Sequence, residues 1–165
     1  MKKLEDDFME YAIVRVDKDN YTMFDEMIFY RENNRERNEY EKNEAHDFST
    51  VYETLTNENL YVYAAQYKNI FVGWISIVYI PKVSWTKGKG HLYIDELWVN
   101  PSYRNKGIAK ALMLEADKLV MNAAKPNILG IRLYVDANNE EALPLYKKCG
   151  YRGVNDDAVF MEKEL

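Results

Sequence analysis

Hydrophobic residues in the first third of the chain recur at spacings that predict one strand followed by two helices. Residues 11–16 predict the strand. Asp19-Asn20 then offers a helix cap, because apolar side chains follow it at the spacing of a helix face. They are Tyr21, Phe24, Met27 and Ile28. A short helix that ends near Asn57 is expected around four further residues, Phe48, Val51, Tyr52 and Leu55.

Charged and polar residues dominate the segment between these two helices. Residues 31–47 are dense in Glu, Arg and Asn and contain few apolar side chains. This composition favours a solvated helical face or a loop. A recognition element for a partner is the alternative that the composition leaves open.

The middle of the chain has the composition of a β-hairpin followed by a further strand. Residues 60–67 and 70–80 are rich in aromatic and β-branched side chains, and only Lys68-Asn69 separates them. Residues 81–90 are expected to form a loop because glycine, lysine and proline dominate them. Residues 91–99 then predict the next strand.

From Gly107 onward the spacing changes to that of an amphipathic helix, which Pro126 should stop. The apolar stripe of this helix is predicted to contain Ile108, Ala111, Leu112, Ala116, Leu119, Val120 and Ala123. Residues 128–135 predict a strand, residues 139–148 a helix, and residues 158–162 a final strand.

This order of elements predicts an α/β fold with one mixed sheet and helices on both of its faces. Most of the sheet is expected to be antiparallel. Residues 92–135 should form a right-handed βαβ unit whose two strands are parallel. A length of 165 residues suits a single domain over residues 1–165.

Composition and charge exclude several classes of protein. Hydrophobic residues make up 47% of the chain, which excludes a disordered chain, and Cys149 as the single cysteine excludes a disulfide-stapled scaffold. No stretch approaches the roughly 20 apolar residues that cross a bilayer. We therefore expect a soluble, cytoplasmic protein with no membrane partner. A net charge of -5 argues against a nucleic-acid partner, which requires a basic face.

The segment from Asp95 to Ala109 carries the strongest chemical signal in the sequence. A strand runs through a short turn into an amphipathic helix, whose first amides have no partner within the helix. These amides lie at the positive end of the helix dipole and suit a phosphate. Gly107 lets an oxyanion approach the backbone, and Arg104 and Lys106 add positive charge at the rim. A helix start with an incidental glycine is the alternative.

Two blocks of this segment and of the residues after it resemble the GNAT superfamily of acetyl-CoA-dependent N-acyltransferases. The first is similar to the acyl-CoA signature of that family and consists of Leu97-Trp98-Val99 followed by Arg104-x-x-Gly107-x-Ala109. The second resembles the following strand and helix and consists of Leu133-Tyr-Val135, Asn139, Ala142, Leu145-Tyr146 and Gly150-Tyr151. The resemblance covers residues 91–151.

The resemblance implies how acetyl-CoA would bind as co-substrate. The backbone amides that would hold the CoA diphosphate are those of Arg104, Asn105, Lys106, Gly107, Ile108 and Ala109. The backbone of residues 97–99 (Leu97, Trp98 and Val99) would pair with the pantetheine arm, in a slot where this strand parts from the strand of residues 133–135. Asn139 would contact the pantetheine or the neighbouring backbone, and Tyr146 would lie near the thioester sulfur.

Two residues depart from the family pattern. Asn105 stands where a second glycine is common, and Tyr151 replaces the usual phenylalanine. Neither change should prevent phosphate binding, because the amides of residues 106–109 do not depend on these side chains.

The chemistry of an amine acceptor requires a base. An alkyl amine with a pKa of about 10.4 must lose a proton before it attacks, and a carboxylate can accept that proton. Asp95 and Glu96 are the candidates, and Glu96 is preferred because its side chain reaches further. Pairing of either carboxylate with the lysines of residues 82–90 is the alternative.

The two carboxylates are expected on opposite faces of the strand. Strict alternation places Asp95 with Tyr93, Leu97 and Val99, and Glu96 with Leu92, Ile94 and Trp98. A β-bulge of the kind found in the family would disturb this pattern.

The leaving thiolate calls for an acid, and the Tyr146 phenol is the candidate implied by the resemblance. A backbone amide near Val99 would stabilise the oxyanion. Cys149 is expected to be a small hydrophobe rather than a nucleophile. His46 and His91 lack metal-ligand spacing, so no metal is expected; His91 is predicted to be a surface histidine, with a role as substrate-side base as the alternative.

These observations lead us to expect an N-acetyltransferase that moves the acetyl group of acetyl-CoA to a primary amine by direct attack in a ternary complex. The acceptor is expected to be a small-molecule or peptide amine, and the sequence does not choose among a polyamine, an aminoglycoside and a peptide. A non-catalytic acyl-CoA-binding sensor or interaction module of the same fold is the alternative. The resemblance also allows a homodimer.

Overall fold

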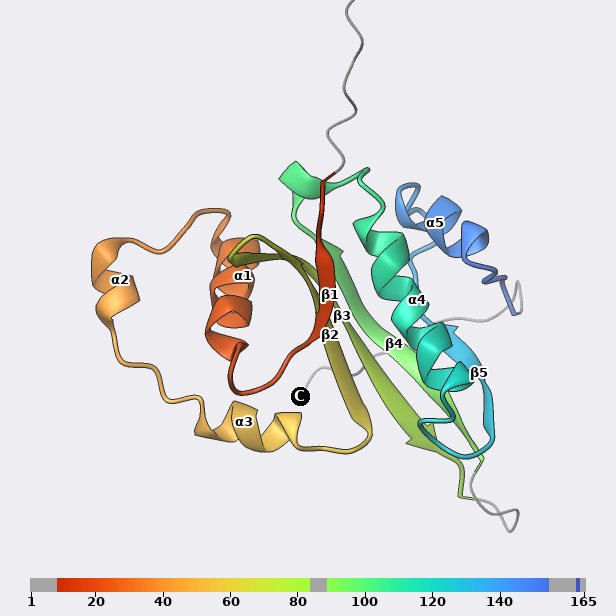
Figure 1. Ribbon diagram of the computed structural model, residues 1–165. Helices are drawn as coiled ribbons and strands as arrows, with labels where there is room; N and C mark the ends of the chain where they lie inside the picture. Colours follow the sequence, from red (N-terminus) through yellow and green to blue (C-terminus); the bar gives the residue numbers. More distant parts are fainter. Residues whose placement is uncertain (1–8, 84–88, 155–162, 164–165) are drawn as a thin grey trace, which may run out of the picture.

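The computed structural model of the chain describes residues 9–83 and 89–154, together with residue 163. Its centre is a five-stranded sheet whose strands follow one another in chain order (Figure 1). The strands are β1 (Ala12–Arg15), β2 (Leu60–Tyr67), β3 (Ile70–Pro81), β4 (Gly90–Val99) and β5 (Ile128–Leu133). The helices are α1 (Tyr21–Asn33), α2 (Glu39–Asn43), α3 (Ser49–Leu55), the 3-10 turn η1 (Pro101–Tyr103), α4 (Ile108–Met121) and α5 (Ala142–Lys148).

Neighbouring strands pair antiparallel from β1 to β4, whereas β4 and β5 are parallel. A parallel pair needs a long crossover, and α4 provides it. The predicted α/β fold with a mostly antiparallel sheet and a parallel βαβ unit is therefore confirmed. The final strand predicted at residues 158–162 lies outside the described residues.

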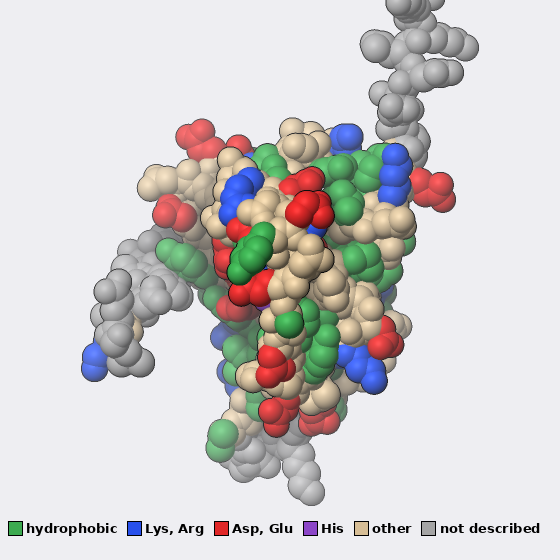
Figure 2. All heavy atoms as spheres, turned by 90° about the vertical axis from the view of Figure 1, so that its left-hand side faces the viewer, with side chains coloured by type: hydrophobic (Ala, Val, Ile, Leu, Met, Phe, Trp, Pro, Cys, Tyr) green, Lys and Arg blue, Asp and Glu red, His purple; other side chains and the backbone are tan. Residues whose placement is uncertain are grey.

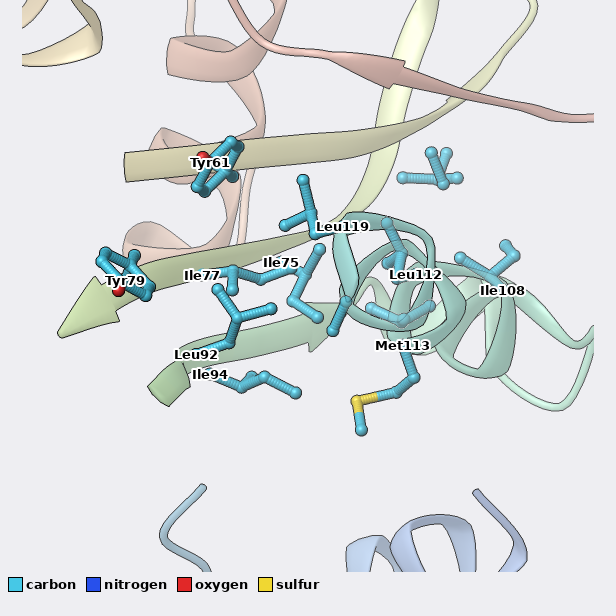
Figure 3. Packing of buried hydrophobic residues seen from close by; sticks show 14 residues of the cluster. Tyr61, Ile75, Ile77, Tyr79, Leu92, Ile94, Ile108, Leu112, Met113 and Leu119 are labelled. Atoms are coloured by element: carbon cyan, nitrogen blue, oxygen red, sulfur yellow. The ribbon is translucent and has the colours of Figure 1, made fainter. Parts of the chain in front are cut away.

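Helices cover both faces of the sheet and enclose a hydrophobic core on each (Figure 1). On one face, α4 packs its apolar side against β2, β3 and β4 (Figure 3). On the other face, Phe24 and Met27 of α1 pack with Phe71 and Trp74 of β3. We call these the α4 core and the α1 core. Strand β3 supplies both, because successive side chains of a strand point to opposite faces.

The buried stripe of α4 differs from the prediction at its C-terminal end. Val120 is exposed and Ala123 lies beyond the helix, whereas Met113 is buried in the α4 core. The helix ends at Met121 because Ala123 adopts a left-handed conformation, with φ of 49°. The amides of Ala123 and Ala124 then bond back to Val120 O and Leu119 O, as in a Schellman motif. Pro126 is therefore not the residue that stops this helix.

Asn20 precedes α1 as predicted, but its side chain does not cap the helix. Its amide nitrogen donates to Arg15 O at 2.9 Å, and its oxygen accepts from the Asp17 amide at 3.0 Å. Asn20 therefore closes the turn between β1 and α1. The turn still places the first apolar residue of α1 where the periodicity predicts it.

The charged segment after α1 is solvent-exposed, as predicted, and is held by ion pairs. No residue of α2 is buried, and a capping box between Asn38 and Glu41 starts that helix. Arg37 donates to Asp25 at 2.6 Å and to Glu26 at 2.8 Å, which ties the segment to α1. Within the described ranges, no helix is long and apolar enough to cross a membrane.

Candidate active site

The turn before α4 forms a concave row of backbone amides. Asn105 and Gly107 have positive φ angles of 61° and 82°, and Gly107 is the N-cap residue of α4 without any side-chain cap. Within the described part of the chain, no acceptor bonds the amides of residues 105–110. Alternating left-handed residues at a helix start make an anion-binding concavity of the kind predicted here.

The conformation of the turn explains two residues of the sequence motif. A residue with a side chain is strained at the φ of Gly107. Space is not the reason, because a Cβ added there would lie 3.6 Å from the nearest atom, Tyr11 Oη. Asn105 also lies in the left-handed region, which Asn tolerates better than most residues. Asparagine can therefore take the left-handed conformation that a glycine would otherwise supply.

Arg104 has a structural role in addition to its charge. Its Nε donates to Val99 O at 3.2 Å, and its Nη1 pairs with Glu141 at 3.1 Å. The side chain thus connects the end of β4 to the residue before α5. The Arg104 amide bonds to Pro101 O at 3.4 Å, so the free amides begin at Asn105 rather than at Arg104.

Strands β4 and β5 part beside this turn. Their pairing ends at Ile94 and Leu133, whereas β4 stays paired with β3 as far as Val99. The Asn100 amide bonds to Val72 O in β3, so by alternation the backbone groups of Trp98 also face β3. The backbone groups of Leu97 and Val99 then face the side from which β5 has departed.

A β-bulge at Asp95 changes which side chains share a face. Ser76 pairs with Glu96 and the next residue of β3, Ile77, pairs with Ile94, so Asp95 has no partner. Leu92 and Ile94 consequently lie in the same α4 core as Leu97 and Val99, and Trp98 packs against the α1 core. The prediction from strict alternation, which grouped Glu96 with Leu92 and Ile94, is therefore wrong.

Glu96 faces α1 and is bound there by an arginine that sequence reasoning did not single out. Nη1 and Nη2 of Arg31 both lie 3.1 Å from Glu96 Oε1. The Arg31 guanidinium also lies over the Trp74 ring, with Cζ 5.8 Å from the ring centroid. The alternative partners Lys82 and Lys89 do not pair with Glu96, whose described partner is on α1, and Lys87 lies outside the described residues. Asp95 is exposed, and no ion pair among the described residues involves it.

Tyr146 lies on α5 and packs against the α4 core. Burial raises the pKa of its phenol, so the hydroxyl keeps its proton at neutral pH. Helix α5, which follows β5, thus places this side chain on the face of the sheet that α4 also covers.

The residues after Tyr146 form a Schellman motif that ends α5. Gly150 has a φ of 87°, its amide bonds to Lys147 O, and the Tyr151 amide bonds to Tyr146 O. The rings of Tyr146 and Tyr151 contact each other at 6.2 Å between centroids. A contact between these two positions accompanies the motif in general. The spacing of Tyr146, Gly150 and Tyr151 therefore has a structural cause that is independent of catalysis.

Asn139 holds the turn that leads into α5. Its Oδ1 accepts from the Ala142 amide at 3.0 Å, which is a contact with neighbouring backbone of the kind expected. The helix itself begins at Ala142, three residues later than predicted.

The cysteine and the two histidines of the chain lie in three different environments. Cys149 packs against the α4 core, and burial raises the pKa of its thiol, which disfavours the thiolate. His46 stacks on Phe48 at 5.8 Å. Burial, Arg132 and Lys82 lower the pKa of His91. Among the residues that the structure describes, no group of three His, Cys, Asp or Glu side chains could hold a metal.

Comparisons with known proteins agree on one family. The sequence profile of the acetyltransferase (GNAT) family matches residues 11–151. A spermidine N(1)-acetyltransferase of Thermoplasma acidophilum is 37% identical over 70 residues, which are 41% of this chain and 42% of that enzyme. The match thus spans less than half the length of this curated relative.

Solved structures share the fold at low sequence identity. An aminoglycoside acetyltransferase from an uncultured soil metagenomic sample, in complex with trehalose, has a TM-score of 0.73 at 18% identity, with 94% of this chain and 96% of that chain covered. The acetyltransferase AAC(6')-Iy, in complex with the bisubstrate analogue CoA-S-monomethyl-acetylneamine, has a TM-score of 0.69 at 13% identity, with 94% and 99% covered.

The hydroxyl of Tyr151 provides a test of the packing behind Tyr146. It is buried and has no hydrogen-bond partner in the described residues. Tyr151→Phe is expected to raise the free energy of unfolding by about 1 kcal/mol, because an unsatisfied buried hydroxyl costs about 1–3 kcal/mol. Urea denaturation measures this change, with Tyr40→Phe on an exposed ring as the control. A loss of stability in Tyr151→Phe would contradict the prediction.

Proposed function

Because this chain belongs to the acetyltransferase (GNAT) family, we propose that it transfers the acetyl group of acetyl-CoA to a primary amine by direct attack in a ternary complex. The observation that carries the proposal is the row of free amides at residues 105–110, which lies at the end of a strand with a free backbone edge. An anion and an extended, amide-containing arm are the two parts of CoA that such a surface would bind.

The residues present fit coenzyme A at both parts. The amides from Asn105 to Lys110 would hold the diphosphate, and Lys106 would add charge at the rim. The backbone of Leu97 and Val99 would pair with the amides of the pantetheine arm, as an added strand does. Trp98 lies between them in sequence, and its side chain packs against the α1 core on the other face of the sheet.

Glu96 is the proposed base for the acceptor amine. A protonated alkyl amine, with a pKa of about 10.4, must lose a proton to attack, and a carboxylate can accept that proton directly or through water. Glu96 Oε2 has no partner among the described residues and is free to accept that proton. Asp95, which is exposed at the bulge, is the second candidate.

Tyr146 is the proposed acid for the leaving thiolate. Its proton would pass to the sulfur as the C–S bond breaks, and the second proton lost by the attacking nitrogen would restore the phenol. The pKa that burial raises keeps the phenol protonated at neutral pH. The Val99 amide, on the free edge of β4, would stabilise the oxyanion that precedes this step.

The acceptor is proposed to be a cationic amine. Asp and Glu side chains are spread over the face that carries α1, α2 and α3 (Figure 2). The exposed acidic residues from the last turn of α1 to the start of α3 are Glu32, Glu36, Glu39, Glu44 and Asp47. A surface of this sign speeds the encounter with cations. Polyamines and aminoglycosides both meet this requirement, and similar proteins include a spermidine and an aminoglycoside acetyltransferase.

The direct experiment measures thiol release from acetyl-CoA with a panel of amines at neutral pH. Release with at least one amine is expected. Tight binding of CoA without release for any amine would overturn the enzymatic proposal and favour an acyl-CoA sensor of the same fold.

Gly107→Glu is expected to abolish CoA binding. The substitution forces a side chain into a left-handed position and directs a carboxylate at the diphosphate. Isothermal titration calorimetry with CoA measures the effect, after circular dichroism has shown that the variant is folded. Gly153→Glu, which adds the same side chain where nothing lies within 4 Å of a new Cβ, is the control. Unchanged affinity in Gly107→Glu would refute the placement of the diphosphate.

Glu96→Gln is expected to lower kcat by about 10²- to 10⁴-fold at neutral pH, since a general base contributes on that scale. The defect should shrink as the pH approaches that at which the amine deprotonates without help. Asp95→Asn, measured alongside, should change kcat by only a few-fold. The opposite ranking of the two variants would assign the base to Asp95.

Tyr146→Phe is expected to lower kcat by about 10²-fold or more while the CoA affinity stays within a few-fold of wild type. Because burial raises the pKa of Tyr146, the wild-type enzyme should not lose activity from ionisation of this group between pH 7 and about pH 10. Steady-state kinetics and CoA calorimetry measure both quantities, with Tyr40→Phe as the control. A normal kcat in Tyr146→Phe would remove its role as acid.

A further inference from the structure

We propose that Glu96 and Trp74 form a subsite for an organic cation, and that Arg31 occupies this subsite as a tethered ligand that an acceptor amine must displace. The inference rests on the proposed function for the identity of the acceptor. It names the class of group that the subsite takes, an alkylammonium or alkylguanidinium ion.

The contacts of Arg31 are those of a bound cation. Both terminal nitrogens lie 3.1 Å from a single oxygen of Glu96, and the guanidinium carbon lies 5.8 Å from the centroid of the Trp74 ring. A carboxylate together with an aromatic face is the combination that recognises ammonium and guanidinium groups. The same two groups would therefore accept the head group of a cationic acceptor.

The sheet holds the receiving half of the subsite in place without Arg31. Trp74 is only 6% exposed, and its ring packs edge-on against Phe24 at 5.1 Å between centroids. Glu96 projects from the strand beside it, directly after the bulge, opposite Ser76. Removal of Arg31 should consequently leave the carboxylate and the indole where they are.

Arg31 is the half that can move. It lies in the last turn of α1, its side chain is 36% exposed, and the Glu96 side chain is 42% exposed. An ion pair at this exposure changes an equilibrium constant by about five-fold at most, and the contact with the Trp74 ring changes it by a similar factor, so a ligand can break the two together. A tethered group competes as if it were present at a concentration on the order of millimolar. An acceptor must therefore bind the subsite more tightly than Arg31 does, or be present at a higher concentration.

Displacement also suits the proposed chemistry. While Arg31 is bound, both of its terminal nitrogens contact Glu96 Oε1. Once an acceptor ammonium takes the place of Arg31, the carboxylate is in contact with the proton that it must accept. Arg31 would thus keep Glu96 paired in the absence of an acceptor and release it when one binds.

A titration with small cations tests the subsite without any turnover. The probes are methylguanidinium and methylammonium, and the signal is the indole N–H of Trp74 in ¹⁵N-labelled full-length protein, assigned with Trp74→Phe. Arg31→Ala is expected to show saturable shifts at probe concentrations on the order of millimolar, and at least about five-fold lower than wild type requires. The double variant Arg31→Ala/Glu96→Gln should lose this binding.

The matched control is Arg35→Ala, which removes the same charge from a neighbouring exposed ion pair with Glu41. It should titrate like wild type, and Arg31→Lys, which keeps the cation, should stay within about two-fold of wild type. No saturable binding in Arg31→Ala, or equal affinity in Arg31→Ala and wild type, would overturn the proposal.

Kinetics with an accepted amine provide a second arm. Arg31→Ala is expected to lower the KM of a cationic acceptor by about 3- to 10-fold, with the larger part of the change in KM rather than in kcat. A higher KM, or a loss of kcat alone, would mean that Arg31 assists the acceptor and would overturn the competition. If no amine releases thiol, the proposed function fails, whereas the titration still decides whether the cation subsite exists.

Discussion

The bulge at Asp95 and the end of the β4–β5 ladder one residue before it determine how the rest of the site is arranged. Backbone amides and carbonyls that leave a ladder require new partners, and the edge of β4 beyond Ile94 has lost those of β5. The same strand then runs through η1 into a helix whose first amides are also free. Two stretches of backbone without partners among the described residues therefore lie next to each other. Their combined shape, an edge followed by a concave turn, is what a long ligand with a phosphate end requires.

The bulge also divides the side chains of β4 between two environments. Side chains before and after it share the α4 core, and Glu96 is turned toward α1. The carboxylate consequently lies on the acidic, more exposed side of the sheet, whereas Tyr146 packs on the side of α4. The proposed acid and the proposed base therefore lie on opposite faces of the sheet.

The helix-ending motif of α5 shows that one set of residues can meet two requirements. Gly150 and Tyr151 end the helix through backbone bonds to the turn that contains Tyr146. The ring of Tyr151 then packs on that of Tyr146 and limits its rotation. Rigid placement is useful to an acid that must meet a particular sulfur atom. The helix-ending motif requires this spacing, and the proposed role of Tyr146 as acid would require it too, so the spacing by itself does not separate the two.

The sequence by itself determined the fold class and most of the described elements, and it located the turn of free amides before α4, because these depend on local periodicity and on residues that are close in the chain. It predicted the amides around Gly107 and the candidate pair of carboxylates without any tertiary information. Only the tertiary structure decided which way Glu96 faces, since a single bulged residue reverses the alternation of everything after it. The sequence also did not predict that Arg31 and Trp74 lie close to Glu96. They are 65 and 22 residues from Glu96, and only the packing of α1 on the sheet brings a cation, an indole and a carboxylate together.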